Sequence, residues 1–205
     1  MTPAGLGDDA CHGVRPRRRD RGKRVDRTFA KGLAPTQARR LCSVTVPELT
    51  IRPMTAADAH AVAARRYPGE YSFYDADADP DDLAELLNPA EWGQHYFAAD
   101  EIAQHELAGL LVVKLTGPVA EIGLGLRPDL TGHGLGESFV RICLRFASAA
   151  LGAQSYTLVV AAFNHRAITV YERAGFQEVE RFEHFTNGGF HAFIRMARGA
   201  TEDPP

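Results

Sequence analysis

Three glycines alternate with other residues at Gly132, Gly134 and Gly136, between an apolar run that ends near Pro128 and an amphipathic segment. Glycine lets backbone N–H groups approach an anion closely, and the N-terminus of a helix adds about half a positive charge. The apolar residues after the turn recur at the spacing of one helical face: Leu135, Phe139, Ile142 and Phe146. The pattern therefore predicts a strand, a glycine turn and a helix whose N-terminus binds phosphate.

The glycine spacing excludes two other phosphate-binding motifs. A Walker loop requires G-x-x-x-x-G-K-[ST], and no lysine follows any of these glycines. The dinucleotide fingerprint requires G-x-G-x-x-G, whereas the glycines here fall at every second position. The phosphate is therefore expected to belong to another class of ligand.

Residues 124–136 resemble the pyrophosphate loop of the GNAT superfamily, whose members are acyl-CoA-dependent N-acetyltransferases. In that family a strand ending in V-x-P leads to [RQ]-x-x-G-x-[GA] at the start of a helix. Four residues match this pattern: Leu126, Pro128, Gly134 and Gly136. Thr131 stands where the family usually has arginine or glutamine, so we expect a modestly weaker phosphate site.

A second segment, Asn164–Phe176, reads NHRAITVYERAGF and fits the family pattern N-x-x-A-x-x-x-Y-x-x-x-G-F without a gap. Asn164 follows an apolar run and is expected to cap a helix, which Gly175 should end as its C′ residue. The resemblance implies that Asn164 contacts the pantetheine arm and that Tyr171 lies near the thioester sulfur. Taken alone, Asn164 could be only a helix cap and Tyr171 only a packing residue.

The two segments together predict a site for acetyl-CoA, which the resemblance implies as the cosubstrate. Backbone groups at the end of the strand before the turn are expected beside the thioester: Leu124, Gly125 and Leu126. The turn and the helix start are expected to hold the pyrophosphate: Thr131, Gly132, His133, Gly134, Leu135, Gly136 and Glu137. No spacing of histidine or cysteine indicates a metal site.

Acyl transfer to an amine requires a proton acceptor for the amine, donors for the developing oxyanion and an acid for the leaving thiolate. Many members of the superfamily carry an acidic residue in the strand before the turn, and Glu121 is its counterpart here. We expect Glu121 to act as the base through water and Tyr171 to act as the acid. If Glu121 faces solvent away from the site, water alone takes the proton.

An aromatic and acidic connection between the first two predicted helices is the candidate acceptor pocket. It contains Tyr67, Glu70, Tyr71, Phe73, Tyr74 and Asp75. Aromatic faces beside carboxylates suit a cationic amine. A loop that only covers the core is the alternative, and Trp92 could belong to either arrangement.

Charge is distributed unevenly along the 205 residues, whose formal net charge is −3. Residues 1–43 carry 11 Lys and Arg against 4 Asp and Glu, and the remainder carries 12 against 22. The basic, apolar-poor N-terminal part is expected to be disordered, and the acidic remainder favours a cationic acceptor. We expect no nucleic-acid partner. No apolar run suits a membrane span or a secretory signal, which favours a cytoplasmic protein.

The chain is expected to form a basic extension over residues 1–45, one domain over 46–198 and a tail over 199–205. Apolar patterns and turn residues predict strands at 49–52, 94–99, 107–115, 119–126, 156–163, 176–185 and 190–196. Helices are predicted at 55–66 and 81–87, after the glycine turn, and after Asn164. This order predicts an α/β protein with the GNAT fold, in which about four helices flank a mixed, mostly antiparallel seven-stranded sheet.

The sequence thus predicts an N-acetyltransferase that moves an acetyl group from acetyl-CoA directly to a primary amine of a small molecule or protein. We expect a monomer or a homodimer. Two alternatives stay open, a protein N-terminal or lysine acetyltransferase and a non-catalytic acyl-CoA-binding regulatory module. No motif of the pocket loop names the acceptor.

Overall fold

The computed structural model describes residues 48–199, so the predicted extension over 1–45 and the tail beyond residue 199 lie outside the described residues. Its strands are β1 (Leu49–Pro53), β2 (Tyr96–Glu101), β3 (Glu106–Thr116), β4 (Val119–Leu126), β5 (Ser155–Ala161), β6 (Gln177–Thr186) and β7 (Gly189–Arg198). Its α-helices are α1 (Ala56–Ala63), α2 (Pro80–Leu86), α3 (Gly136–Leu151) and α4 (His165–Arg173). Three short 3-10 helices complete it: η1 (Gly69–Tyr74), η2 (Ala76–Ala78) and η3 (Pro128–Leu130).

The strands form one seven-stranded sheet in the order β1-β2-β3-β4-β5-β7-β6. Every neighbouring pair is antiparallel except β4 and β5, which run parallel. Two-residue turns set the register of two hairpins, with Gly117–Pro118 between β3 and β4 and Asn187–Gly188 between β6 and β7. Asn187 and Gly188 both have positive φ, as the turn of a twisted hairpin requires. The predicted mixed and mostly antiparallel sheet is confirmed.

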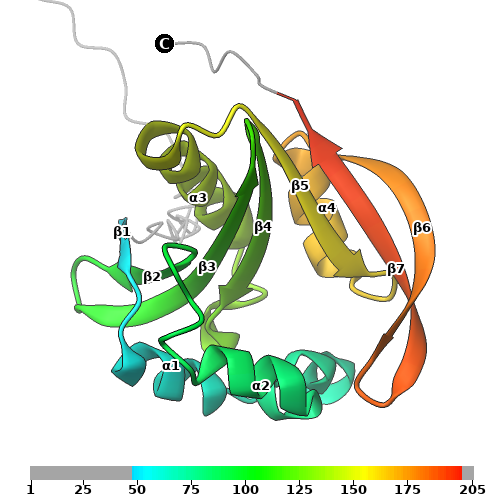
Figure 1. Ribbon diagram of the computed structural model, residues 1–205, viewed down its shortest axis with the longest axis horizontal. Coiled ribbons are helices and arrows are strands. Elements are labelled where there is room, and N and C mark those ends of the chain that lie inside the picture. Colours follow the sequence, from blue (N-terminus) through cyan, green and yellow to red (C-terminus); the bar gives the residue numbers. More distant parts are fainter. Residues whose placement is uncertain (1–47, 200–205) are drawn as a thin grey trace, which may run out of the picture. The chain divides into compact units, whose positions relative to one another are not determined.

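Helices cover both faces of this sheet (Figure 1). Helices α3 and α4 pack on one face, over the larger apolar core that contains Leu111, Ile122, Phe139, Leu158 and Met196. Helices α1 and α2 contribute to a smaller cluster on the other face: Met54, Ala59, Leu86 and Trp92. None of the helices within residues 48–199 has the length and apolar content that crossing a bilayer requires.

Strands β4 and β5 pair over only three positions, from Val119 opposite Ser155 to Glu121 opposite Thr157. Beyond that point β4 remains paired with β3, and β5 remains paired with β7. The two strands therefore diverge toward the side on which α1 and α2 lie (Figure 1). We call the region beyond Glu121 and Thr157 the splay. It is the one place in the described sheet where two neighbouring strands expose unpaired backbone to each other.

Helix α1 is tied to the sheet by a group of charged residues. Thr55 caps the helix and forms a capping box with Asp58. Asp58 also accepts a hydrogen bond from Arg52 of β1 at 2.6 Å, and Arg52 reaches Asp100 of β2 at 2.6 Å. The helix ends at Ala63 rather than at residue 66 as predicted, and the Arg65 side chain that follows it bonds to the Gly125 carbonyl of β4.

Candidate active site

Backbone groups of β4 face the splay. The two-residue turn at Gly117–Pro118 makes Thr116 and Val119 a hydrogen-bonded pair, so every second residue of β4 bonds to β3. Alternation along the strand directs the N–H and C=O groups of Leu124 and Leu126 the other way, into the splay. An extended ligand can pair with these groups as a further strand would.

Residues that follow α1 fix the end of β4 from the other side. The Tyr67 hydroxyl donates to the Leu126 carbonyl oxygen at 2.9 Å, and the Arg65 guanidinium donates to the carbonyls of Gly125 and Leu107 at 3.3 and 3.4 Å. Burial lowers the pKa of Arg65 and raises that of Tyr67. Because the Leu126 carbonyl is already occupied, its N–H and both backbone groups of Leu124 are the ones available to a ligand. Sequence reasoning missed Arg65, since no motif marks a contact 60 residues away along the chain.

The glycine turn leads from β4 into α3 as predicted. Gly132 and Gly134 have φ values of 82° and 78°, in the left-handed region that favours glycine. A Cβ built on either residue would meet nothing within 4 Å, so the turn opens onto free space. Leu135 is the N-cap of α3 and provides no side-chain hydrogen bond to the first turn. The first N–H groups of α3 therefore lack a capping side chain and can bind an anion.

Gly136 lies where α3 packs closely against α4. A Cβ at this position would lie 3.0 Å from Cγ2 of Val170, so the missing side chain lets α3 and α4 approach each other. Of the other predicted phosphate contacts, His133 is exposed and Glu137 pairs with Arg141 at 3.0 Å one turn along the helix. The open part of the turn is thus centred on Gly132 and Gly134.

Asn164 lies on the far side of the splay, where β5 leads into α4. Its side-chain oxygen accepts a hydrogen bond from the Ala167 N–H at 3.2 Å, which confirms the predicted helix cap. Tyr74 of η1 reaches the same point, because its hydroxyl accepts from the Ala161 N–H at 3.3 Å. Burial raises the pKa of Tyr74, and its hydrogen bonds to Asn164 and Ala161 oppose this rise. Tyr74 thereby links η1 to the end of β5.

Tyr171 is half-buried on the inner face of α4. Its ring packs against the main core and lies edge-to-face with Phe176, with ring centroids 6.0 Å apart. Burial raises the pKa of its hydroxyl, with smaller contributions from Tyr74 and Cys143. Among residues 48–199 no hydrogen bond to this hydroxyl is formed, yet the oxygen is not sealed from solvent. A neutral phenol with a free donor therefore lies beside the end of β5.

Glu121 is the last residue of β4 that pairs with β5, so it lies at the apex of the splay. The side chain is exposed and stands between Lys114 of β3 and Thr157 of β5 in the register. Its neighbours Ala120 and Ile122 are buried against α3, so Glu121 faces the side of α1 and α2, opposite to Tyr171. Glu121 and Tyr171 therefore lie on opposite faces of the sheet.

The predicted acceptor residues separate: Phe73 lies near the tip of the β6–β7 hairpin, whereas Tyr67 bonds to the end of β4. Phe73 packs edge-to-face on Phe163 and His191, and Asn187 donates to its carbonyl at 2.8 Å. The ring of Tyr71 is already covered by the Arg166 guanidinium, 3.6 Å from its centroid. Trp92 is buried and donates to the carbonyls of Glu85 and Leu86, so it belongs to the α2 cluster.

A family model for the acetyltransferase (GNAT) domain matches residues 48–177. The chain belongs to the GNAT acetyltransferase family. The match includes the glycine turn, the splay and α4, which are the parts of the GNAT domain that the sequence singled out.

Solved GNAT structures share this fold. A chimera of the spermidine N-acetyltransferase SpeG from Vibrio cholerae and hSSAT is 25% identical, with a TM-score of 0.58 over 74% of this chain and 96% of that chain. A GNAT-family acetyltransferase from Bacillus anthracis is 19% identical, with a TM-score of 0.61 over 75% and 96%. The Vibrio cholerae spermidine N-acetyltransferase in complex with CoA and spermine is 23% identical, with a TM-score of 0.57 over 74% and 95%. No curated protein matches the sequence significantly.

No group of three or more His, Cys, Asp or Glu side chains within residues 48–199 could hold a metal ion. Cys143 is buried in the core, and burial raises the pKa of its thiol well above the usual range.

Restoring the usual GNAT cation should strengthen the phosphate site. Thr131 adopts an ordinary extended conformation, and its hydroxyl only donates to the Pro128 carbonyl at 2.7 Å. Thr131→Arg should tighten CoA binding by about 0.5–1 kcal/mol at low salt, the scale of an exposed ion pair. Calorimetric titration at low and high salt measures this, with Thr131→Gln as the uncharged control. A gain that survives at about 1 M salt, where exposed charges are screened, would contradict an electrostatic origin.

Proposed function

We propose that the protein transfers an acetyl group from acetyl-CoA directly to a primary amine. One observation carries the proposal: the splay presents the free backbone groups of Leu124 and the free N–H of Leu126, and it leads to a glycine turn that opens onto the N-terminus of α3. The open space at Gly132 and Gly134 fits a pyrophosphate, and the extended edge of β4 fits the amide-bearing pantetheine arm. Asn164 borders the same splay from the side of β5.

The chain's own residues supply the proton transfers of this reaction. The amine nitrogen forms a bond to the carbonyl carbon of the thioester while the carbon–sulfur bond breaks. One backbone N–H of this edge stabilises negative charge on the carbonyl oxygen, because the N–H groups of Leu124 and Leu126 lie two residues apart along the strand and a single oxygen reaches only one of them. Glu121 takes the amine proton through water, and the Tyr171 hydroxyl donates to the sulfur as it becomes a thiolate. Acetylated amine and CoA thiol are the products.

The acceptor is proposed to be a cationic amine, with polyamines first among them. Six carboxylates and no basic side chain lie between residues 75 and 85, beside the aromatic residues of η1. Partial desolvation, followed by the neighbouring carboxylates, raises the pKa of Asp82. The 25% identical SpeG chimera bears the name of a spermidine N-acetyltransferase, which supports the same class.

The experiment measures the release of CoA thiol from acetyl-CoA with a panel of acceptors. The panel contains spermidine, spermine, small amines with a single amino group, and peptides with a free N-terminus or a lysine. Turnover that is highest with polyamines supports the proposal. Preference for peptides would favour the protein acetyltransferase. Tight CoA binding without turnover on any amine would favour the regulatory module.

Removing the proposed base should slow the reaction without disturbing the fold. Glu121 is exposed and forms no ion pair among residues 48–199, so Glu121→Gln should leave the melting temperature unchanged. We expect kcat to fall by about 10²-fold, the lower end of general base catalysis. Glu172→Gln, an exposed carboxamide substitution outside the splay, is the matched control. An undiminished rate for Glu121→Gln would leave proton removal to water alone.

A further inference from the structure

Strand β6 is the last strand of the sheet, and no other strand within residues 48–199 pairs with its outer side. The two-residue turn at Asn187–Gly188 makes Thr186 and Gly189 a hydrogen-bonded pair. By alternation, residues 180, 182 and 184 bond to β7, whereas Arg181, Glu183 and Phe185 direct their N–H and C=O groups outward. A ten-residue edge with free backbone groups is a template for pairing with another chain.

Exposed apolar side chains accompany this edge. Val179 is 58% exposed, Phe185 is 60% exposed and Phe190 of β7 is 72% exposed. The rings of Phe185 and Phe190 contact each other, with centroids 5.2 Å apart, and so form one apolar patch at the hairpin tip. Val179 lies at the opposite end of the edge. Contiguous exposed apolar side chains such as Phe185 and Phe190, unlike single exposed residues, mark surfaces that contact a partner.

The charges along β6 distinguish which partner fits. We propose that β6 pairs antiparallel with β6 of a second copy, across a twofold axis at Phe182. In this register Arg181 lies opposite the partner's Glu183, and Glu180 lies opposite the partner's His184. Val179 lies at a register shift between Glu178 and Glu180, just beyond the regular part of the edge, and comes near the partner's Phe185, so the two exposed apolar ends approach each other. The outward-facing residues meet outward-facing residues, which is the pairing that antiparallel hydrogen bonds require.

Neighbouring registers are disfavoured by charge. Moving the axis to Arg181 would place two arginines opposite each other, and moving it to Glu183 would place two glutamates opposite each other. Like charges directly opposite on paired strands are destabilising, whereas opposite charges contribute favourably. Because the interface is twofold, each pair occurs twice. The axis at Phe182 is thus the register in which the charges of the strand complement themselves.

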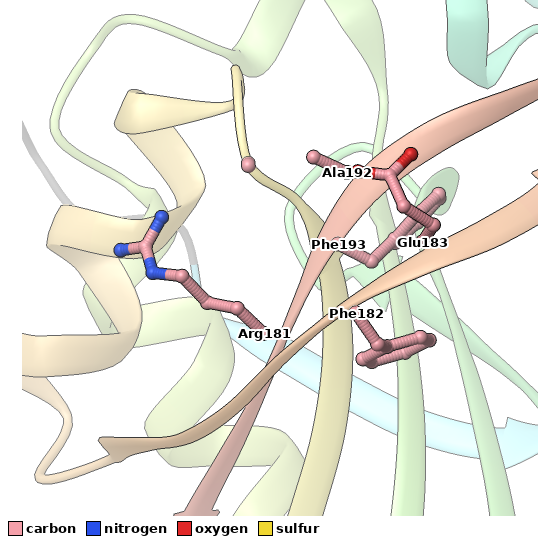
Figure 2. A pocket seen from close by; sticks show the side chains of 6 residues that line it. Arg181, Phe182, Glu183, Ala192 and Phe193 are labelled. Atoms are coloured by element: carbon pink, nitrogen blue, oxygen red, sulfur yellow. The ribbon is translucent and has the colours of Figure 1, made fainter.

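The Arg181 side chain remains accessible to a partner. A hollow of about 420 Å³ is lined by the same part of β6 and its neighbours: Ala162, Arg181, Phe182, Glu183, Ala192 and Phe193. Figure 2 shows the Arg181 side chain extending from β6 away from Phe182. Within its own chain Arg181 contacts Glu178 at 2.6 Å, and its side chain is still 63% exposed. A guanidinium has five N–H donors, so Arg181 can bond to Glu178 and to the partner's Glu183 together.

Charge reversal tests the register. Sedimentation velocity of the full chain over about 1–100 µM should show a reversible dimer, since mass action shifts such an equilibrium with concentration. Arg181→Glu and Glu183→Arg each convert two attractive pairs into two repulsive ones. Each should raise the dimer dissociation constant by about tenfold or more. The double variant restores opposite charges and should return the dissociation constant to within about threefold of the parent.

The control is Arg145→Glu, which makes the same charge change on the exposed face of α3 and should leave the dimer unaltered. Circular dichroism melting of each variant verifies that the monomer is folded. Three outcomes would overturn the proposal. The first is a parent chain that stays monomeric, as it would if another segment of the chain covered β6. The second is a dimer whose dissociation constant neither single variant changes. The third is a dissociation constant that stays raised in the double variant. The result does not depend on the proposed acetyl transfer.

Discussion

Replacing Tyr171 with phenylalanine should lower kcat by about 10²-fold or more, the scale of general acid catalysis. The substitution keeps the ring, which packs edge-to-face on Phe176 and against the core. It removes only a hydroxyl that has no hydrogen-bond partner among residues 48–199. CoA affinity and stability should therefore change by less than about 1 kcal/mol, the net contribution of one hydrogen bond.

The physical reason lies in the charge that develops on sulfur. Burial raises the pKa of Tyr171, so the phenol keeps its proton throughout the working pH range and can donate to a thiolate. This interaction is stronger in the transition state than in the bound thioester, so its loss lowers kcat and kcat/KM together. Because the pKa is raised, the parent should show no loss of rate from ionisation of Tyr171 up to about pH 10, the usual pKa of tyrosine.

Single-turnover kinetics and calorimetric titration of CoA separate the rate from the affinity. Tyr156→Phe is the matched control, because Tyr156 is buried in β5 and its hydroxyl donates to the Leu144 carbonyl at 3.0 Å. That variant should lose stability and keep its rate. If Tyr171→Phe turns over as fast as the parent, Tyr171 is a packing residue and the acid assignment is wrong.

Local signals in the sequence were sufficient for much of the scaffold. Asn164 caps α4 through its own side chain, Gly175 ends the helix with φ of 91°, and Asn187–Gly188 forms the hairpin turn. Each of these depends on residues within a few positions along the chain. The connection that was predicted only as a loop with acidic and aromatic residues forms the turns η1 and η2, which lack the apolar periodicity that marks a helix.

Contacts between distant segments could not be read from the sequence. Arg65 and Tyr67 bond to the backbone of β4, and nothing in their neighbourhood along the chain indicates a carbonyl partner. Arg166 covers the Tyr71 ring, so the aromatic wall proposed for a cationic acceptor already holds a cation of the protein itself. The missing side chain of Gly136 makes room for Val170 of α4. These features depend on the tertiary arrangement of η1, α3 and α4.

Valine at position 134 should weaken CoA binding by at least about 10²-fold, because two charge-assisted hydrogen bonds are each worth ~1.5–3 kcal/mol. Gly134 has φ of 78°, a conformation that a β-branched residue avoids, so the turn must change to accept valine. A Cβ at Gly134 meets no protein atom within 4 Å, so the new side chain projects into the space proposed for the pyrophosphate. The backbone N–H groups then no longer converge on the anion.

Gly152→Val provides the control that separates backbone strain from ligand loss. Gly152 lies at the C-terminal end of the same helix and has φ of 75°, and a Cβ added there would also meet nothing within 4 Å. Both variants should lose stability on the same scale, roughly 1–3 kcal/mol for a strained residue, and both should unfold cooperatively. Only Gly134→Val should lose CoA affinity in a calorimetric titration, since the C-terminus of a helix repels an anion that the N-terminus attracts. Equal CoA affinity in the two variants would mean that the pyrophosphate does not bind at this turn.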